Sequence, residues 1–122
     1  MIIGTLKEKK KFENRVAISP DEVKSYLKSG HQVLIEKGAG SLSGFTDKSY
    51  KEAGATITNS KEVLKTSEII IKINCPSPEE SKLINNKAMV VSQISTQNNQ
   101  ESIKILNSRK VSAFALELVP RI

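Results

Sequence analysis

Three polar side chains stand where a binding site of an α/β protein would form. Arg15 lies in a polar loop after the first apolar segment, and Lys72 and Asn74 follow an apolar run at residues 69–71. An arginine can hold a carboxylate or a phosphate through two parallel hydrogen bonds. Lys72 and Asn74 alternate along an extended chain, so they point to the same side. We expect these three residues to lie in a cleft; the alternatives are a surface ion pair for Arg15 and a strand that emerges into water.

A glycine-rich segment with the spacing G-x-G-x-x-x-G occupies residues 38–44. Glycines that bind a dinucleotide lead directly into a helix whose first turn faces the pyrophosphate. Here the next helix start, at Thr46 and Asp47, comes only after the last glycine. The acidic residue that would bind a ribose about 20 residues further on is also missing until Glu62. The segment is therefore interpreted as a structural turn.

The residue types offer little for nucleophilic or metal chemistry. Cys75 stands beside Pro76 without a neighbouring base, and His31, the one histidine, belongs to a turn far along the chain. A cysteine nucleophile needs a base within hydrogen-bond reach. The sequence contains no cluster of metal ligands. We therefore assign no catalytic residue and no metal site.

An alternation of strands and helices must position these residues. Ser19, Pro20 and Glu22 combine a capping box with a proline in the first turn, which predicts a helix that ends at Gly30. Ser60 is expected to cap another helix. Further helices are expected from Thr46, Pro78 and Asn99, and strands at residues 1–6, 33–35, 55–58, 68–73, 88–93 and 112–116.

The apolar run within residues 68–73 favours burial on both faces, as in a parallel sheet. Strands that alternate with helices require right-handed crossovers, which place helices on both sides of the sheet. The predicted fold class is therefore α/β, Rossmann-like and doubly wound, with a mainly parallel sheet and helices on both faces.

Composition indicates a small globular domain with a basic surface. Of the 122 residues, 38% are hydrophobic and 26% charged, which suits one core and excludes a disordered chain. The net charge is +6, with a dense lysine run at residues 7–11. Aromatic residues do not alternate with these lysines for base stacking, so no nucleic acid is expected as a partner. One cysteine and no recognisable signal peptide favour the cytoplasm.

Three stretches, in the same order, resemble one protein family. They read G-T-L-K-E-K-K-K-F-E-N-R-V-A-I-S-P at residues 4–20, G-H-Q-V-L-I-E-K-G-A-G at 30–40 and S-G-F-T-D-K-S-Y-K-E-A-G-A at 43–55. The family comprises alanine dehydrogenase and the alpha subunit of proton-translocating NAD(P) transhydrogenase, and the resemblance covers essentially the whole chain. It implies that residues 1–122 form a single N-terminal domain and that the second domain, with the dinucleotide fingerprint, is absent.

Two places make the chain more similar to the transhydrogenase branch. Alanine dehydrogenases carry a lysine at the place of Asn74, and it contacts pyruvate together with the arginine at the place of Arg15. They also carry a catalytic histidine after the fifth strand, where residues 91–99 contain none. Without that lysine and histidine, reduction of a 2-oxo acid lacks its electrostatic clamp and its general acid.

The last residues, E-L-V-P-R-I at 117–122, resemble the start of a transhydrogenase loop that approaches bound NAD(H). The resemblance implies that Arg121 binds the cofactor, whereas Arg15, Lys72 and Asn74 are cleft residues without an assigned role. It further implies hydride transfer between NAD(H) and NADP(H). That reaction needs two nicotinamides held in place rather than acid–base residues.

The same resemblance implies cofactor, partners and location. NAD(H) would bind the complete subunit, whereas the isolated 122-residue chain is expected to bind it weakly and to be inactive. The partners would be the remainder of the alpha subunit, the NADP(H)-binding and membrane components, and a second copy if the protein is a homodimer. The location would be cytoplasmic, peripheral to the inner membrane through partner subunits. Two alternatives stay open: an alanine dehydrogenase-type N-terminal domain, and a non-catalytic binding or assembly module derived from this fold.

Overall fold

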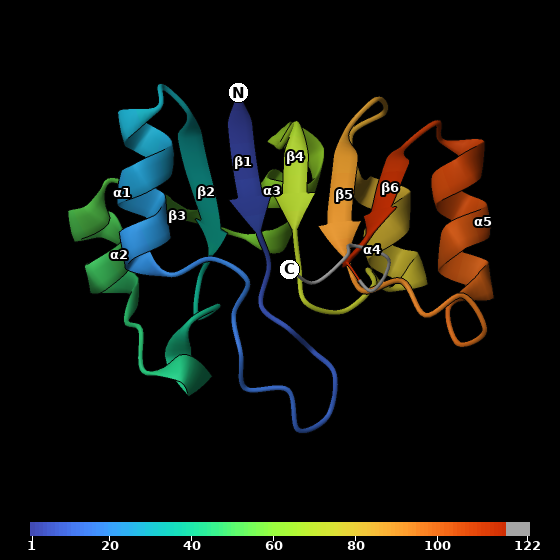
Figure 1. Cartoon of the computed structure of the whole chain (residues 1–122), viewed down its shortest axis with the longest axis horizontal. Coiled ribbons are helices and arrows are strands. Elements are labelled where there is room, and N and C mark those ends of the chain that lie inside the picture. Colours follow the sequence, from blue (N-terminus) through green and yellow to red (C-terminus); the bar gives the residue numbers. More distant parts are fainter. Residues whose placement is uncertain (117–122) are drawn as a thin grey trace, which may run out of the picture.

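Strands and helices alternate through the computed structural model, which describes residues 1–116 (Figure 1). The strands are β1 (Ile2–Thr5), β2 (Gln32–Glu36), β3 (Thr56–Thr58), β4 (Ile69–Ile71), β5 (Met89–Ser92) and β6 (Ser112–Ala115). The helices are α1 (Pro20–Lys28), α2 (Asp47–Ala53), α3 (Ser60–Thr66), α4 (Pro78–Leu83) and α5 (Gln100–Ser108), with a 3-10 turn, η1 (Ser41–Ser43), before α2. Each strand and helix that the sequence predicts is present, with small differences at the ends.

The strands form one sheet in the order β3-β2-β1-β4-β5-β6, and all neighbours in it are parallel. The chain builds outward from β1 to β3, returns to the middle at β4, and builds outward again to β6. The order therefore reverses between β1 and β4, and a crevice is expected at the carboxyl ends of these two strands. The predicted doubly wound α/β fold is confirmed. Within residues 1–116, no helix is long and apolar enough to cross a membrane.

Two hydrophobic cores hold the helices against the sheet. Figure 1 shows that helices cover both of its faces. The core under α1 and α2 contains Ile3, Ile18, Val23, Val33, Ile35 and Tyr50 among its buried residues. The core under α3, α4 and α5 contains Leu6, Val63, Leu64, Ile70, Val90 and Leu106. Aliphatic side chains dominate both cores, which agrees with the aromatic content of only 4%.

Burial of β4 differs from the sequence prediction. Ile70 is fully buried, but Ile69 and Ile71, which point to the other face, are only partly buried. The reason is that α1 and α2 pack over β1, β2 and β3, so these two side chains reach only the edge of that core. An apolar run in sequence does not reveal how far along the sheet a helix layer extends.

One predicted helix cap is wrong. The side chain of Asn59, not that of Ser60, accepts the backbone N–H of Glu62, at 2.9 Å. Ser60 is the first helical residue of α3, because asparagine in an extended conformation caps a helix as well as serine does. The capping box at Ser19 and Glu22 is present as predicted.

The glycine segment before α2 is shaped by Tyr50. A side chain at Gly40 would place its Cβ 2.7 Å from Cε2 of the Tyr50 ring and 2.8 Å from Cβ of Phe45. The Tyr50 hydroxyl donates to the Ile18 carbonyl at 2.7 Å, and burial raises the pKa of Tyr50 to about 12. The η1 turn and the Thr46 cap separate the glycines from α2. This geometry agrees with a structural turn that packs α2 against α1.

The variant Gly40→Ala is expected to lower the free energy of unfolding by about 2 kcal/mol, because the new methyl group meets the buried Tyr50 ring. Gly44→Ala is the matched control. Gly44 has open space around it but a φ of +84°, so only backbone strain of about 1 kcal/mol applies there. Urea unfolding measures both. Equal losses for the two variants would contradict the packing role of Gly40.

Candidate functional site

A cavity of about 550 Å³ opens at the carboxyl end of the sheet, where the strand order reverses. Its wall contains Glu8 from the loop after β1, Lys72 and Asn74 from the segment after β4, and Glu80 from α4. The loop after β5, including Gln93, completes it. Open α/β sheets bind their ligands at this position, so the cavity is the candidate functional site.

Glu8 is the central residue of the wall. Its side chain is 1% exposed. Its Oε1 lies 3.3 Å from Nζ of Lys72 and accepts the backbone N–H of Asn74 at 3.2 Å. Its Oε2 accepts the backbone N–H of Ile73 at 2.9 Å. A buried carboxylate is tolerated only with such donors, and here they come from the segment after β4. Glu8 therefore fastens the loop after β1 to the end of β4.

Lys72 lies between two carboxylates. It is 3% exposed, and its Nζ lies 3.3 Å from Glu8 and 3.9 Å from Oε1 of Glu80. The same Glu80 oxygen accepts the backbone N–H of Ser77 and completes the capping box of α4. The charge of Lys72 is thus already balanced by the protein. It holds the wall together and is not a free cation that awaits an anionic ligand.

Asn74 bridges the carboxylates of Glu8 and Glu13. Its Nδ2 donates to Oε1 of Glu13 at 3.1 Å and to Oε1 of Glu8 at 3.4 Å. Because carboxylates only accept hydrogen bonds, the NH2 group must face them. The amide oxygen of Asn74 therefore points away from these carboxylates and can accept a hydrogen bond from another group. Lys72 and Asn74 both reach Glu8, which agrees with the prediction that they point to the same side.

Arg15 occupies a different environment from the other two candidates. Its guanidinium forms two parallel hydrogen bonds to Glu13, from Nε at 2.8 Å and from Nη2 at 2.9 Å. The Arg15 side chain is 66% exposed, whereas that of Glu13 is 10% exposed. The hydrogen bond from Arg15 lowers the pKa of Glu13 from 4.5 to about 2. The structure thus brings Lys72 and Asn74 together in the cavity wall and connects Arg15 to Asn74 only through Glu13.

Sequence reasoning missed the three carboxylates, Glu8, Glu13 and Glu80. A signal existed only for Glu80, which stands at the third helical position of a Ser-Pro-Glu-Glu start. Its Oε2 has no hydrogen-bond partner among the described residues, and the exposed Lys9 lies 3.9 Å away. Glu8 and Glu13 lie more than 60 residues from Asn74, and no local pattern predicts such contacts.

The remaining residues considered for chemistry stay apart. Cys75 lines the cavity, whereas His31 contacts the N-terminal amine through Nδ1 at 3.1 Å. In residues 1–116, no group of three His, Cys, Asp or Glu side chains is placed to hold a metal ion. Arg121 lies outside the described residues.

The reversed strand order and the crevice beside it define a Rossmann-like α/β domain of the doubly wound class. A family model described as "Alanine dehydrogenase/PNT, N-terminal domain" matches residues 4–122. The chain belongs to this family, which confirms the resemblance inferred from the sequence.

Relatives include both branches. The chain is 39% identical over 122 residues to "NAD(P) transhydrogenase subunit alpha" of Haemophilus influenzae. This match covers 100% of this chain and 24% of that protein. It is 40% identical over 120 residues to alanine dehydrogenase of Methanococcus maripaludis, covering 98% and 32%. The crystal structure of transhydrogenase from Sinorhizobium meliloti matches with a TM-score of 0.93 at 34% identity, covering 100% and 36%. The chain thus spans about a quarter to a third of the length of these relatives.

Replacement of Glu8 by glutamine is expected to lower the free energy of unfolding by about 3 kcal/mol, because Lys72 then remains buried with less compensation. The double variant Glu8→Gln/Lys72→Met should lose less than the sum of the two single variants, since it removes both charges. Urea unfolding of all four proteins measures this coupling. Strictly additive losses would show that the two side chains do not interact.

Titration of Glu13 tests the contact with Arg15. The folded-state pKa of about 2 lies below the ordinary 4.5, so the ionised carboxylate stabilises the fold above pH 4.5. This contribution is lost as the pH falls from 4.5 to about 2. Carboxyl chemical shifts should give a pKa of about 2 for Glu13, and Arg15→Gln should move it toward 4.5. An unchanged pKa in the variant would assign the shift to another cause.

Proposed function

We propose that the chain is the N-terminal domain of the NAD(H)-binding alpha subunit of a proton-translocating NAD(P) transhydrogenase, and that it contributes to hydride transfer between NAD(H) and NADP(H). The observation that carries the proposal is the chemistry of the cavity wall. The positive charge of Lys72 is balanced by the carboxylates of Glu8 and Glu80. An amide side chain, Asn74, occupies the place where a pyruvate-binding lysine would stand. Relatives named as transhydrogenases support it.

In this proposal the chain helps to hold the reactants in place and takes no chemical part in the transfer. Hydride transfer between two nicotinamides requires that the rings be held in place, and it requires no proton donor from this domain. The contacts of Glu8 fix the segment after β4, which gives the crevice one rigid wall. Lys72 and Asn74 are proposed as wall residues, Arg15 as a residue that supports Asn74 through Glu13, and Arg121 as a cofactor-binding residue.

NAD(H) itself is assigned to the remainder of the subunit. The glycines of residues 38–44 do not lead directly into a helix, and Tyr50 fills the space beside Gly40. In this proposal the glycine segment is therefore a structural turn and does not bind the dinucleotide. Residues 1–122 are proposed to be the first domain, with the second, dinucleotide-binding domain outside this sequence.

The proposed partners follow from the similarity to transhydrogenase alpha subunits. They are the remainder of the alpha subunit and the NADP(H)-binding and membrane components, with a second copy in a homodimer. We place the domain on the cytoplasmic side, peripheral to the inner membrane through these partner subunits.

An alanine dehydrogenase-type domain is the second candidate. The identity of 40% to the Methanococcus maripaludis enzyme favours it. Against it stand Asn74 and residues 91–99, which contain no histidine to act as general acid. A binding or assembly module that kept the fold is a third candidate, which loss of all catalysis in the longer gene product would support.

The purified 122-residue chain is expected to transfer no hydride from NADH to an oxidised NADP analogue. The longer gene product, combined with its membrane partner, should do so. The reading frame past codon 122 should encode a strand followed by G-x-G-x-x-G. Absorbance of the reduced analogue measures transfer. Alanine-dependent reduction of NAD+ by the same preparation would favour the second candidate, and turnover by the isolated chain would contradict the assignment.

A further inference from the structure

In the loop after β1, the acidic side chains point into the protein and the basic side chains point into solvent. We define the basic loop as residues 7–13. Its two carboxylates turn inward, since Glu8 is 1% and Glu13 is 10% exposed, and both accept a hydrogen bond from the side chain of Asn74. Its four lysines, Lys7, Lys9, Lys10 and Lys11, are all exposed. The loop is thus held at both ends by buried acids and displays only positive charge to solvent.

Phe12 stands at the tip of the basic loop and is 88% exposed. A turn closed by the Glu13 N–H and the Lys10 carbonyl, at 3.0 Å, holds it there with a φ of +68°. A residue with a large side chain is strained in this left-handed region of backbone conformation, whereas glycine adopts it without strain. Phenylalanine is ordinarily buried, so its exposure at a strained position at the tip of a lysine-rich loop suggests an apolar contact outside the domain.

A second apolar side chain projects from the same end of the molecule. Leu42 of η1 is 64% exposed. The Ser43 hydroxyl donates to the Asn14 carbonyl at 2.6 Å and ties η1 to the chain just after the basic loop. In Figure 1 both segments extend beyond the carboxyl ends of the strands, and the basic loop reaches furthest.

We propose that this end of the molecule binds the surface of a membrane rich in anionic lipid. The Phe12 ring and the Leu42 side chain would enter the interface between headgroups and acyl chains, and the exposed lysines would contact the anionic headgroups. The inference goes beyond the proposed function, in which partner subunits attach the domain to the membrane. It does not depend on hydride transfer.

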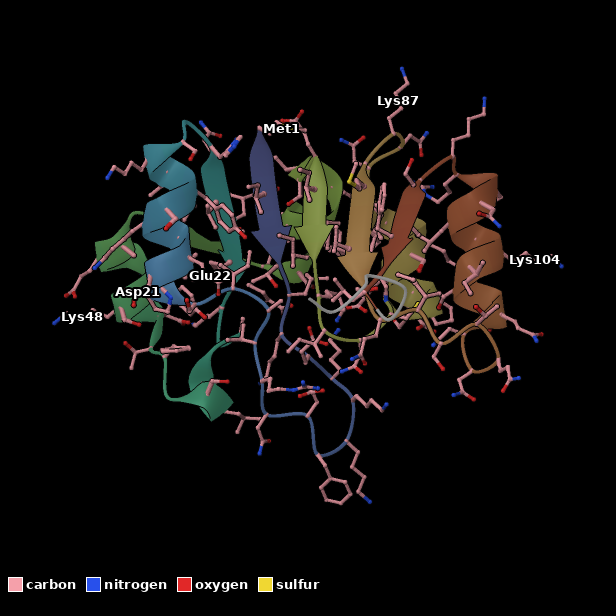
Figure 2. The ribbon with its side chains drawn as sticks, viewed as in Figure 1. Met1, Asp21, Glu22, Lys48, Lys87 and Lys104 are labelled. Carbon is pink, nitrogen blue, oxygen red and sulfur yellow. The ribbon has the colours of Figure 1, made fainter. Side chains whose placement is uncertain are left out.

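Lipid fits these observations better than an acidic protein does. The basic loop is a projecting tip, whereas a stable protein interface needs a complementary surface of about 1,000 Å² or more. A lipid interface accepts a single aromatic side chain surrounded by lysines. The exposed acids Asp21 and Glu22 lie at the start of α1, set back from the tip of the loop (Figure 2).

A tryptophan at the tip tests the contact directly. The chain contains no Trp, so Phe12→Trp introduces a single fluorescent reporter. Its emission should be that of an exposed indole in buffer and should shift to the blue with vesicles of equal parts phosphatidylserine and phosphatidylcholine. Vesicles of phosphatidylcholine alone should give no shift, and high salt should abolish it. Phe114→Trp, at a side chain of β6 that is 56% exposed, is the matched control and should not respond.

Co-sedimentation with the same vesicles measures how much Phe12 and Lys11, whose Nζ lies 5.2 Å from the centre of the Phe12 ring, each contribute to binding. Phe12→Ser should lower the partition coefficient about tenfold, since the apolar insertion is lost. Lys11→Gln should lower it about fivefold, which is the effect of one lysine near an anionic surface. Neither residue lines the cavity, and both are exposed, so the fold should be unaffected. Lys104→Gln, on α5 at the side of the molecule in Figure 2, removes the same charge and should have no effect.

Three results would overturn the proposal. Equal losses for Lys11→Gln and Lys104→Gln would show that only the net charge matters. Absence of any blue shift of Phe12→Trp with anionic vesicles would show that the tip does not enter the lipid. A blue-shifted emission without vesicles would show that protein covers the tip.

Discussion

The buried carboxylate of Glu8 is the contact on which the candidate site depends. The sheet order reverses between β1 and β4. Backbone hydrogen bonds of Lys72 and Ile73 join the segment after β4 to β5, whereas its hydrogen bonds to the segment after β1 come from a side chain. Glu8 joins these two segments, because its two oxygens accept hydrogen bonds from the Lys72 side chain and from the N–H groups of Ile73 and Asn74. A buried charge is costly unless every acceptor is used, so the contact admits few other geometries. The cavity takes its shape from this constraint.

The inward direction of the acids also decides what the surface displays. Glu8, Glu13 and Glu80 are largely buried and compensate Lys72 and Arg15. The lysines of the basic loop have no acid between them at the surface, so this end of the molecule displays much of the net charge of +6. One set of contacts therefore has two consequences: Lys72 is paired inside the cavity wall, and the exposed lysines of the loop beside it, of which Lys9 and Lys10 also line the cavity, make that loop strongly basic.

Membership in the family and membership in one of its two branches depend on different features of the chain. Membership in the alanine dehydrogenase/PNT N-terminal domain family follows from the match over residues 4–122, and identities of 39% and 40% do not separate its two branches. The distinction that we propose between the branches rests on Asn74, whose amide bridges two carboxylates, and on residues 91–99, which contain no histidine. The chain spans only a quarter to a third of the length of these relatives.

The sequence by itself determined the α/β class, the six strands and most helix starts, because apolar periodicity and caps are local patterns. It also placed Lys72 and Asn74 on one side of the chain, since alternation along an extended segment is local as well. Only the tertiary structure decided that Glu8 and Glu13 meet Asn74, that Glu13 occupies the guanidinium of Arg15, and that Ile69 and Ile71 stay half-buried. The contacts of Asn74 join residues more than 60 positions apart, and the burial of β4 depends on how far the helix layer extends. Strand order and helix packing set such features, and no short stretch of sequence encodes them.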